Sequence, residues 1–377
     1  MLSALEAVAV ARSAGQMTAL TFKTWRATAG RPYETEAVGA SCVRLSTCRF
    51  IVCKSLVELM KSTMARSKPA RIFIDGEAGT TGLGIRERLA AVAGVEVLSI
   101  DPAARKDEGA KRALYERADL VVLCLPDDAA KAAAALADGL PDGGPRIVDA
   151  STAHRVAEGW TYGFAELAPD QADRIAKSRR VANPGCYPTG AIALLRPLVD
   201  AGIIPPDYPV SINAVSGYSG GGRTMIEAYD KGVAPPFELY GLGLAHKHVP
   251  ELMKYSGLTH RPIFVPSVGN FREGMLVSVP LHLDTLPGKP TAADLLAVLA
   301  ERYKDQVQVE VVDADPTAKF AGKLAADTLK STDQMQLFVF PNETERHAVL
   351  VARLDNLGKG ASGAAVQNLK LMLGLPA

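Results

Sequence analysis

The sequence has no long apolar run, no excess of charge of either sign and few cysteines. Its 377 residues carry 42 Lys and Arg against 41 Asp and Glu, which gives a formal net charge of +1. Since no basic cluster is interleaved with aromatic residues, we expect no nucleic-acid partner. No apolar run approaches the ~20 residues that span a bilayer, so we expect no membrane partner either.

The cysteines are too few and too unevenly placed for a disulfide framework. There are five, an odd number, at positions 42, 48, 53, 124 and 186. Only Cys124 and Cys186 lie in the part of the chain with clear strand and helix patterns. Paired cysteines are typical of secreted proteins, so this distribution predicts reduced thiols and a cytoplasmic protein.

Residues 1–63 differ in texture from the rest, because they show no clear helix or strand periodicity over long windows. One interpretation is a targeting peptide, since Arg-rich leaders with Ser and Thr are a known type. The acidic residues at positions 6, 34, 36 and 58 argue against it. We prefer the interpretation that Met64 opens the well-patterned sequence, and that residues 1–63 are a poorly ordered extension or a mis-assigned start.

A glycine-rich turn between a short strand and a helix is the main feature of the first half. Residues 71–75 predict a buried strand and residues 83–92 a helix, with further strands at 95–100 and 120–125. This is the βαβ unit of a dinucleotide-binding fold, in which glycines let the backbone approach a pyrophosphate at the helix N-terminus. We therefore predict nucleotide contacts from Gly76, Gly79, Thr80, Thr81 and Gly82.

The residues after the second predicted strand leave the identity of the nucleotide open. Asp101 stands where an acid would hold the ribose 2′-hydroxyl of NAD. Arg105 and Lys106 follow closely and could instead meet the 2′-phosphate of NADP. Ordinary solvated loop charge is the alternative for all three. Ser151 ends a later predicted strand, where polar residues would lie near the cofactor.

The run Asn183-Pro184-Gly185-Cys186-Tyr187-Pro188-Thr189-Gly190 places a cysteine in a rigid turn before an apolar helical run, residues 191–199. Unpaired N–H groups and the positive end of a helix dipole favour the thiolate, which is the nucleophilic form. A buried, inert cysteine beside a turn is the alternative. The local sequence alone favours neither.

Beyond this helix the pattern changes to alternating strands, expected at 210–215, 275–283, 307–312 and 348–354. Alternation of apolar and polar residues is typical of a sheet with one face covered. We predict an α/β protein with a Rossmann-type domain at 70–183 and an α+β substrate and catalytic domain, mainly antiparallel, at 184–354. Residues 355–377 are expected to form a helix that returns to the first domain, because its apolar face needs a partner.

Three polar segments of this second half are candidates for the site. Arg223 follows a glycine-rich stretch and offers a planar fork for phosphate or carboxylate, or is a solvent-facing loop arginine. His246 and His248 could supply an acid or base, with Glu251 available to orient a ring. They could also be a packed pair, whereas a metal is disfavoured because no further Cys/His cluster accompanies them. The glycine-rich helix start at residues 355–364 is an anion site or a packing contact.

In their residues and in their order along the chain, these motifs resemble those of the N-acetyl-γ-glutamyl-phosphate reductase family, and specifically its shorter, type 2 branch. The resemblance covers about residues 70–377 and rests on six runs: Ile72–Gly82, Asp149–Arg155, Asn183–Gly190, Gly217–Arg223, His246–Glu251 and Lys359–Gly363. It implies NADPH as cofactor, an acyl phosphate as small-molecule substrate, and a homo-oligomer, dimer or tetramer.

The resemblance also implies roles for individual residues. Cys186 would displace phosphate to form a thioester, and hydride would then give a thiohemiacetal that collapses to the semialdehyde. His248 is favoured over His246 as the proton carrier, and Arg223 is expected to contact the leaving phosphate. The remaining assignments are Asn183 and Ser219 to the substrate, and Asn356, Lys359 and Gly360 to the cofactor. The rivals are another acyl-phosphate reductase, such as an aspartate-semialdehyde dehydrogenase, and a non-catalytic NADP-binding sensor.

Overall fold

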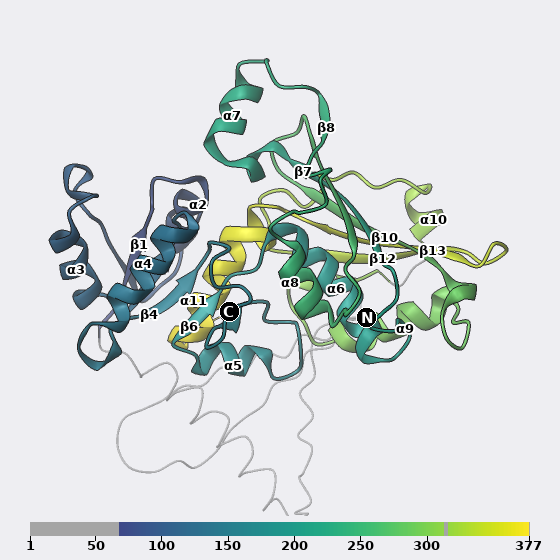
Figure 1. Ribbon diagram of the computed structural model, residues 1–377, viewed down its shortest axis with the longest axis horizontal. Coiled ribbons are helices and arrows are strands. Elements are labelled where there is room, and N and C mark those ends of the chain that lie inside the picture. Colours follow the sequence, from purple (N-terminus) through teal and green to yellow (C-terminus); the bar gives the residue numbers. More distant parts are fainter. Residues whose placement is uncertain (1–67, 313–315, 377) are drawn as a thin grey trace, which may run out of the picture. The chain divides into compact units, whose positions relative to one another are not determined.

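The computed structural model describes residues 68–312 and 316–376, which fall in one compact unit. The expectation for residues 1–63 lies outside the described residues. Within the described part the chain forms two sheets, A and B, with helices packed on them (Figure 1). The domain boundaries expected at 183/184 and 354/355 stay a prediction.

Sheet A is parallel throughout, in the order β2-β1-β3-β4-β6-β5. Its strands are β1 (Ala70–Asp75), β2 (Val95–Leu98), β3 (Leu120–Leu123), β4 (Arg146–Asp149), β5 (Thr161–Tyr162) and β6 (Arg180–Ala182). The chain winds outward from β1 in both directions, as in a doubly wound nucleotide-binding fold. The predicted Rossmann-type class is confirmed.

Helices cover both faces of sheet A. On β1, Ile72 and Ile74 pack in one apolar cluster and Phe73 in another, because successive side chains point to opposite faces. One face packs against α2 (Thr80–Leu89), α5 (Gln171–Lys177) and α11 (Gly363–Leu373), and the other against α3 (Glu108–Arg117) and α4 (Asp127–Asp138). The last helix of the chain, α11, therefore packs on sheet A, whose strands come from the first half of the described chain.

Sheet B is mixed, in the order β11-β12-β13-β10-β7-β9-β8. Its strands are β7 (Ser211–Gly217), β8 (Phe237–Leu239), β9 (Ile263–Gly269), β10 (Met275–His282), β11 (Val309–Val311), β12 (Met335–Asn342) and β13 (His347–Leu354). Of its pairings, β7 with β9 and β11 with β12 are parallel and the others antiparallel. The prediction of a mainly antiparallel sheet is confirmed.

Only one face of sheet B is fully covered by the described residues. Met275, Val277, Val279 and Leu281 of β10 are buried against the helices, while the residues between them are not, so the predicted alternation is confirmed. The covering helices are α6 (Cys186–Asp200), α8 (Val249–Ser256) and α9 (Ala292–Tyr303). On the opposite face, α10 (Pro316–Phe320) packs near β12. The helix α7 (Gly222–Asp230) stands apart from these layers (Figure 1).

Short helical turns complete the described chain: η1 (Pro102–Ala104), η2 (Pro141–Gly143), η3 (Tyr218–Gly221), η4 (Leu283–Thr285) and the π-helix η5 (Gly358–Ser362). None of the helices in the described residues combines the length and apolarity that a bilayer crossing needs.

The sequence missed several strands. β9 and β12 contain Pro266 and Pro341, residues that argue against a strand interior when read alone. β5, β6 and β8 are only two or three residues long. α6 also starts earlier than expected, because Pro188 is tolerated in the first turn of a helix, so Cys186 is itself the first helical residue.

Candidate active site

The glycine turn after β1 leads into the N-terminus of α2. Gly76 has φ +91°, and a Cβ there would lie 2.2 Å from the carbonyl oxygen of Cys124. Among the described residues, no side chain caps the N-terminus of α2 and no acid lies in its first turn. The free N–H groups of this helix therefore remain available to a phosphate.

A cavity of about 900 Å³ opens over this turn. Its lining contains the residues predicted to bind the cofactor in the turn and at the end of β4, namely Gly76, Gly79, Thr80, Thr81, Gly82 and Ser151. A side chain at Gly76 would clash with the backbone of Cys124 after β3, so only glycine lets the turn pack there. We call this the nucleotide cavity.

A second cavity, of about 390 Å³, contains Cys186. Predicted residues from outside the glycine turn line it with the cysteine: His246, His248, Asn183, Ser219 and Asn356. Gly360 also lines it, since a Cβ on this glycine would lie 2.9 Å from the Cβ of Cys186. We call this the cysteine cavity.

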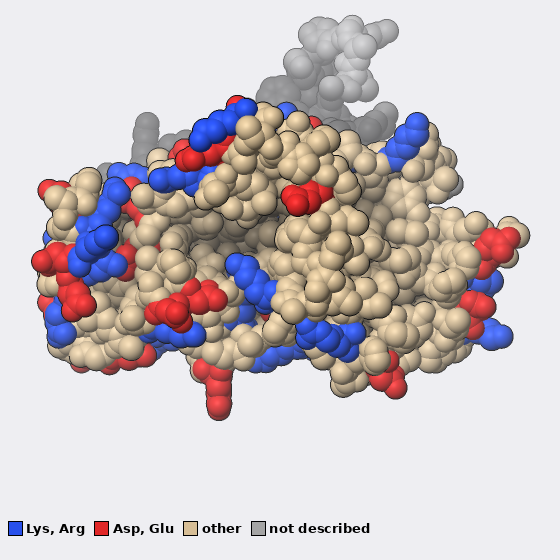
Figure 2. All heavy atoms as spheres, turned by 45° about the horizontal axis from the view of Figure 1, so that its top comes forward, with Lys and Arg blue, Asp and Glu red and all other residues tan. Residues whose placement is uncertain are grey.

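The two cavities adjoin. Residues that line both are Thr80, Thr81, Ala150, Arg155, Gly222 and Lys247. A ligand in the nucleotide cavity can therefore reach toward the cysteine without crossing a packed core. The space-filling view shows a hollowed face with Lys and Arg side chains at the rim of the hollow (Figure 2).

The environment of Cys186 opposes the charge that its helix favours. Burial raises the pKa of the Cys186 thiol to about 11, while Arg155 and the backbone N–H groups of Tyr187 and Cys186 lower it. The backbone N–H groups at the helix N-terminus thus favour the thiolate in the predicted direction, but burial has the larger effect on the pKa. The thiol needs a base to ionise at neutral pH.

The two predicted histidines are adjacent, with ring centroids 4.6 Å apart. The backbone N–H of His248 donates to Nδ1 of His246 over 3.2 Å. His248 is buried, and its Nδ1 has no hydrogen-bond partner among the described residues. Burial, and then Arg155, hold the pKa of His248 well below its usual range, so the ring is neutral and can accept a proton.

Gly185 is the point where the catalytic candidates converge. A Cβ on this residue would lie 2.6 Å from Nη1 of Arg155, 2.7 Å from Oε1 of Glu251 and 2.8 Å from Nε2 of His248. Gly185 is the N-cap of α6 and directly precedes Cys186. Only a residue without a side chain allows these three groups to approach the cysteine turn.

Arg155 was not singled out as a site residue from the sequence. Its guanidinium is buried, donates from Nη1 to Oε1 of Glu251 over 2.7 Å and from Nε to the carbonyl oxygen of Asn183 over 3.0 Å. With a weaker contact to Ala150 it engages three of its five N–H donors, which leaves two for a ligand. The sequence signal that could have identified Arg155 is its place in the run Asp149–Arg155, one of the six runs that carry the family resemblance.

The sequence suggested that Glu251 could orient a histidine ring, but in the structure it contacts other groups. Its carboxylate accepts hydrogen bonds from Arg155, from the hydroxyl of Tyr162 over 2.9 Å and from the backbone N–H of Gly185 over 3.1 Å. The side chain is buried, so these donors compensate its desolvation. Glu251 therefore fixes Arg155 and the cysteine turn instead.

Asn183, Ser219 and Asn356 are engaged in holding the site together. Asn183 donates from Nδ2 to the carbonyl oxygen of Ala361, and Asn356 donates from Nδ2 to Oγ of Ser219 over 2.9 Å. Asn356 also accepts the backbone N–H of Gly274. Their assignments to substrate and cofactor stay predictions.

Lys359 corrects a prediction. Its ammonium is buried and donates to Glu166 over 2.7 Å, to Gln367 over 2.8 Å and to Gln308 over 3.0 Å. All three N–H donors of the ammonium are used. Lys359 is not among the described residues that line the nucleotide cavity or the cysteine cavity. Lys359 is therefore held in a buried ion pair with Glu166, and these contacts argue against its predicted role as a cofactor ligand.

Three other basic residues lie away from the cysteine. Arg223 lines the nucleotide cavity and donates to the carbonyl oxygen of Ala78 over 2.6 Å, and in the described structure it is absent from the cysteine cavity. Arg105 and Lys106 are exposed after η1. Asp101 caps that turn by accepting the backbone N–H of Ala103 over 2.8 Å. Residues 68–312 and 316–376 contain no cluster of three or more potential metal ligands.

Comparisons with known proteins show the family and the fold of the chain. A family model described as semialdehyde dehydrogenase, dimerisation domain, matches residues 186–356. Proteins named N-acetyl-gamma-glutamyl-phosphate reductase from Brucella ovis and Brucella canis are each 55% identical over 309 residues, covering 81% of this chain and 99% of the relative.

Solved structures add the fold. Aspartate semialdehyde dehydrogenase II from Vibrio cholerae, complexed with ASA, has a TM-score of 0.59 and 16% identity. The Candida albicans enzyme, solved with NADP, has a TM-score of 0.55 and 13% identity. Both matches cover 81% of this chain and 99% of the other, and at such identities they show the fold alone. By its 55% identity over nearly the whole length of those relatives, the chain belongs to the N-acetyl-γ-glutamyl-phosphate reductase family.

Proposed function

We propose that this protein reduces N-acetyl-γ-glutamyl phosphate to N-acetylglutamate semialdehyde with release of phosphate, as the names of its relatives indicate. The observation that carries the proposal is the position of Cys186 in a cavity that adjoins a phosphate-binding glycine turn. This arrangement suits an oxidoreductase of amino-acid biosynthesis that works through a thioester. The arginine pathway follows from the substrate.

The first step is acylation of Cys186. His248 accepts the thiol proton, and the sulfur attacks the acyl carbon and expels phosphate, leaving a thioester. The neutral state of His248 suits it to this task, and His246 supports it through the bond to the His248 backbone. The backbone N–H groups of Cys186 and Tyr187 face the sulfur side and can stabilise the developing oxyanion.

Arg155 is our candidate for the substrate phosphate. Two of its N–H donors remain available, it lines both cavities, and Glu251 fixes its orientation. The earlier candidate, Arg223, lies on the nucleotide side, where it could meet a cofactor phosphate. Lys247 is exposed between the cavities and adds positive charge there.

We propose NADP as the cofactor. Gly76, Gly79, Thr80, Thr81 and Gly82 would hold its pyrophosphate, and when bound it would supply the hydride that reduces the thioester. Asp101 is occupied as a cap, whereas Arg105 and Lys106 follow it with exposed charges suited to a 2′-phosphate. The NADP named for the Candida albicans relative supports the choice.

One assay on the purified protein tests the activity. In the reverse direction, N-acetylglutamate semialdehyde with phosphate and NADP should give NADPH, and aspartate semialdehyde should react far more slowly. Cys186→Ser should lower this rate at least ~1000-fold, because serine has no accessible anion at neutral pH. A serine variant within tenfold of the native rate would contradict the thioester route, and faster turnover of aspartate semialdehyde would contradict the substrate.

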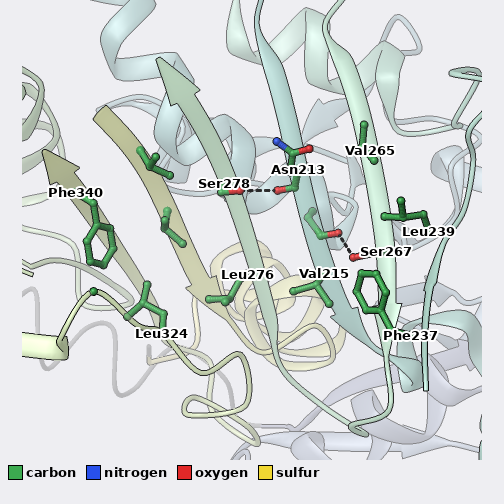
Figure 3. Close-up of a pocket in the computed structure, with 14 residues that line it drawn as sticks. Asn213, Val215, Phe237, Leu239, Val265, Ser267, Leu276, Ser278, Leu324 and Phe340 are labelled. Atoms are coloured by element: carbon green, nitrogen blue, oxygen red, sulfur yellow. Dashed lines mark hydrogen bonds between the residues drawn. The ribbon is translucent and has the colours of Figure 1, made fainter. Parts of the chain in front are cut away.

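We further propose a homodimer in which the open face of sheet B is the interface. A depression of about 640 Å³ lies on this face, and its lining includes Val215, Leu276, Val349 and Phe340 (Figure 3). A contiguous apolar face of this kind is typical of protein interfaces. The name of the matching family model supports dimerisation. Because Cys186 must stay a free thiol, we place the protein in the cytoplasm.

A further inference from the structure

The loop that follows β4 closes on one buried carboxylate. Asp149, the last residue of β4, is fully buried. It accepts the backbone N–H of Ser151 over 2.9 Å and the hydroxyl of Ser151 over 2.8 Å, and it also contacts His154. The hydroxyl of Ser151 in turn accepts the backbone N–H of Ala153 over 3.1 Å. A single carboxylate therefore ties the start of the loop to its end.

The ring of His154 is held in two ways. Its Nδ1 lies 2.6 Å from Oδ2 of Asp149, and because a carboxylate only accepts, this nitrogen is the donor. The ring also stacks on that of Trp160, with centroids 4.0 Å apart and an interplanar angle of 11°. His154 is buried. A buried imidazole with a hydrogen bond to a carboxylate and a stacked neighbour has one preferred place in the loop.

Asp149, His154 and Trp160 lie behind the site and not in it. They are not among the described residues that line the nucleotide cavity or the cysteine cavity. The loop residues next to them, Ala150 and Arg155, line both cavities. Any effect of the buried pair on the reaction must therefore pass through the part of the loop that it holds.

Arg155 is anchored at its two ends by different parts of the molecule. Its backbone follows directly on His154 and so on the loop of sheet A. Its guanidinium donates to Glu251 over 2.7 Å, and its carbonyl oxygen accepts the hydroxyl of Tyr255 over 2.7 Å, both from α8. The N–H donors that remain free can point at a ligand beside Cys186 only while both anchors hold.

We infer that His154 is a positioning residue for this reaction: held by Asp149 and Trp160, it sets the place from which Arg155 reaches the substrate phosphate. The inference rests on the proposed function, in which Arg155 binds that phosphate. His154 itself touches neither substrate nor cofactor and carries no proton of the reaction. Because guanidinium–phosphate hydrogen bonds are directional, a displacement of Arg155 by about 1 Å would weaken the binding of phosphate.

Three full-length variants separate the hydrogen bond from the space that the ring fills. His154→Phe keeps an aromatic ring beside Trp160 and removes the donor to Asp149, whereas His154→Ala removes both. His154→Asn returns an N–H donor close to the place of Nδ1. The matched control is His260→Phe, because this histidine is exposed and lies outside the loop.

Inorganic phosphate is the probe, with two readouts. In the reverse reaction, His154→Phe and His154→Ala should raise KM for phosphate at least ~10-fold and leave KM for NADP within about twofold of the native value. His154→Asn should bring KM for phosphate back to within about threefold of the native value. The second readout needs no turnover: it is the phosphate concentration that halves the rate at which iodoacetamide alkylates Cys186, followed by mass spectrometry. This concentration should rise by the same factor as KM.

Four outcomes would overturn the inference. The first is a native affinity for phosphate in His154→Phe and His154→Ala. The second is an equal rise in KM for phosphate and for NADP, which would indicate general disruption of the loop. The third is an asparagine variant as impaired as the phenylalanine variant, which would show that the bond to Asp149 is not what matters. The fourth is a native protein in which phosphate fails to protect Cys186.

Failure of the proposed function would look different. A native protein whose Cys186 is protected by phosphate, but which shows no reductase activity, would refute the proposed reaction. The protection assay on the His154 variants would then still decide whether His154 positions Arg155, because it depends only on the binding of phosphate.

Discussion

Sheets A and B differ in how much of each sheet the chain itself covers. Sheet A carries helices on both faces, and its strand β3 is buried at every residue. Sheet B carries helices on one face, and its strand β10 alternates between buried and accessible residues. Parallel sheets need both faces covered, whereas antiparallel ones can leave one face to solvent or to a partner.

The two sheets therefore contribute different parts of the site. The covered sheet A supplies a rigid strand end and the uncapped α2 for a nucleotide. Sheet B packs beneath α6, which carries Cys186, and leaves its other face open for the proposed dimer contact. The site lies where the two meet, so that a change in either sheet should affect a different half of the reaction.

The largest effect should come from the covered face of sheet B. Leu194 of α6 is fully buried, so Leu194→Ala should lower the free energy of unfolding by about 2–5 kcal/mol through lost burial and a cavity. The matched change on the open face, Val349→Ala, should cost less than about 1 kcal/mol in the monomer. Urea unfolding at several protein concentrations measures both. Equal costs at low concentration would contradict the asymmetry of the two faces.

The next effect concerns the junction of the sheets. Gly185→Ala should lower kcat/KM by about 100-fold, because the new methyl group displaces Arg155, Glu251 and His248 from the cysteine turn. Binding of NADPH, followed by fluorescence, should change little. Gly139→Ala is the control, since its Cβ would make only ordinary contacts at 3.6 Å. Activity near the native level in Gly185→Ala would argue against this convergence of groups.

A smaller effect is expected on the sheet A side. The double variant Arg105→Ala, Lys106→Ala should raise KM for NADPH about tenfold and leave KM for NADH nearly unchanged, because two charges near a 2′-phosphate are lost. Steady-state kinetics with both cofactors measures the difference. An equal change in KM for both cofactors would show that Arg105 and Lys106 do not recognise the 2′-phosphate.

The smallest effect is a slope of stability with pH. The pKa of His248 is lowered in the folded protein, so the unfolded chain binds the proton first as the pH falls below about 6.5. Stability should therefore decrease as the pH falls from 7 toward the lowered pKa. His248→Asn should reduce this slope in urea titrations. An unchanged slope would show that His248 does not carry the linkage.

Much of the fold could be predicted from local pattern. The glycine turn between a strand and a helix, the alternation in β10 and the cysteine at a helix start each occupy a short stretch, and each is present in the structure, although α6 begins earlier than expected. The strands that were missed contain proline or are very short, so their local signal opposes their role. Hydrogen bonding to neighbouring strands overrides that signal in the folded protein.

The site was only partly predictable, because its key contacts join distant residues. Arg155 and Glu251 are 96 positions apart, and Lys359 and Glu166 are 193. By itself the sequence determined a glycine turn of the kind found in nucleotide-binding folds, a cysteine at a helix N-terminus and the family, since these are local patterns of residue type. Only the tertiary structure decided which charged groups reach Cys186, that burial outweighs the helix in its pKa, and that Lys359 points inward, because burial and long-range pairing arise only when the chain packs.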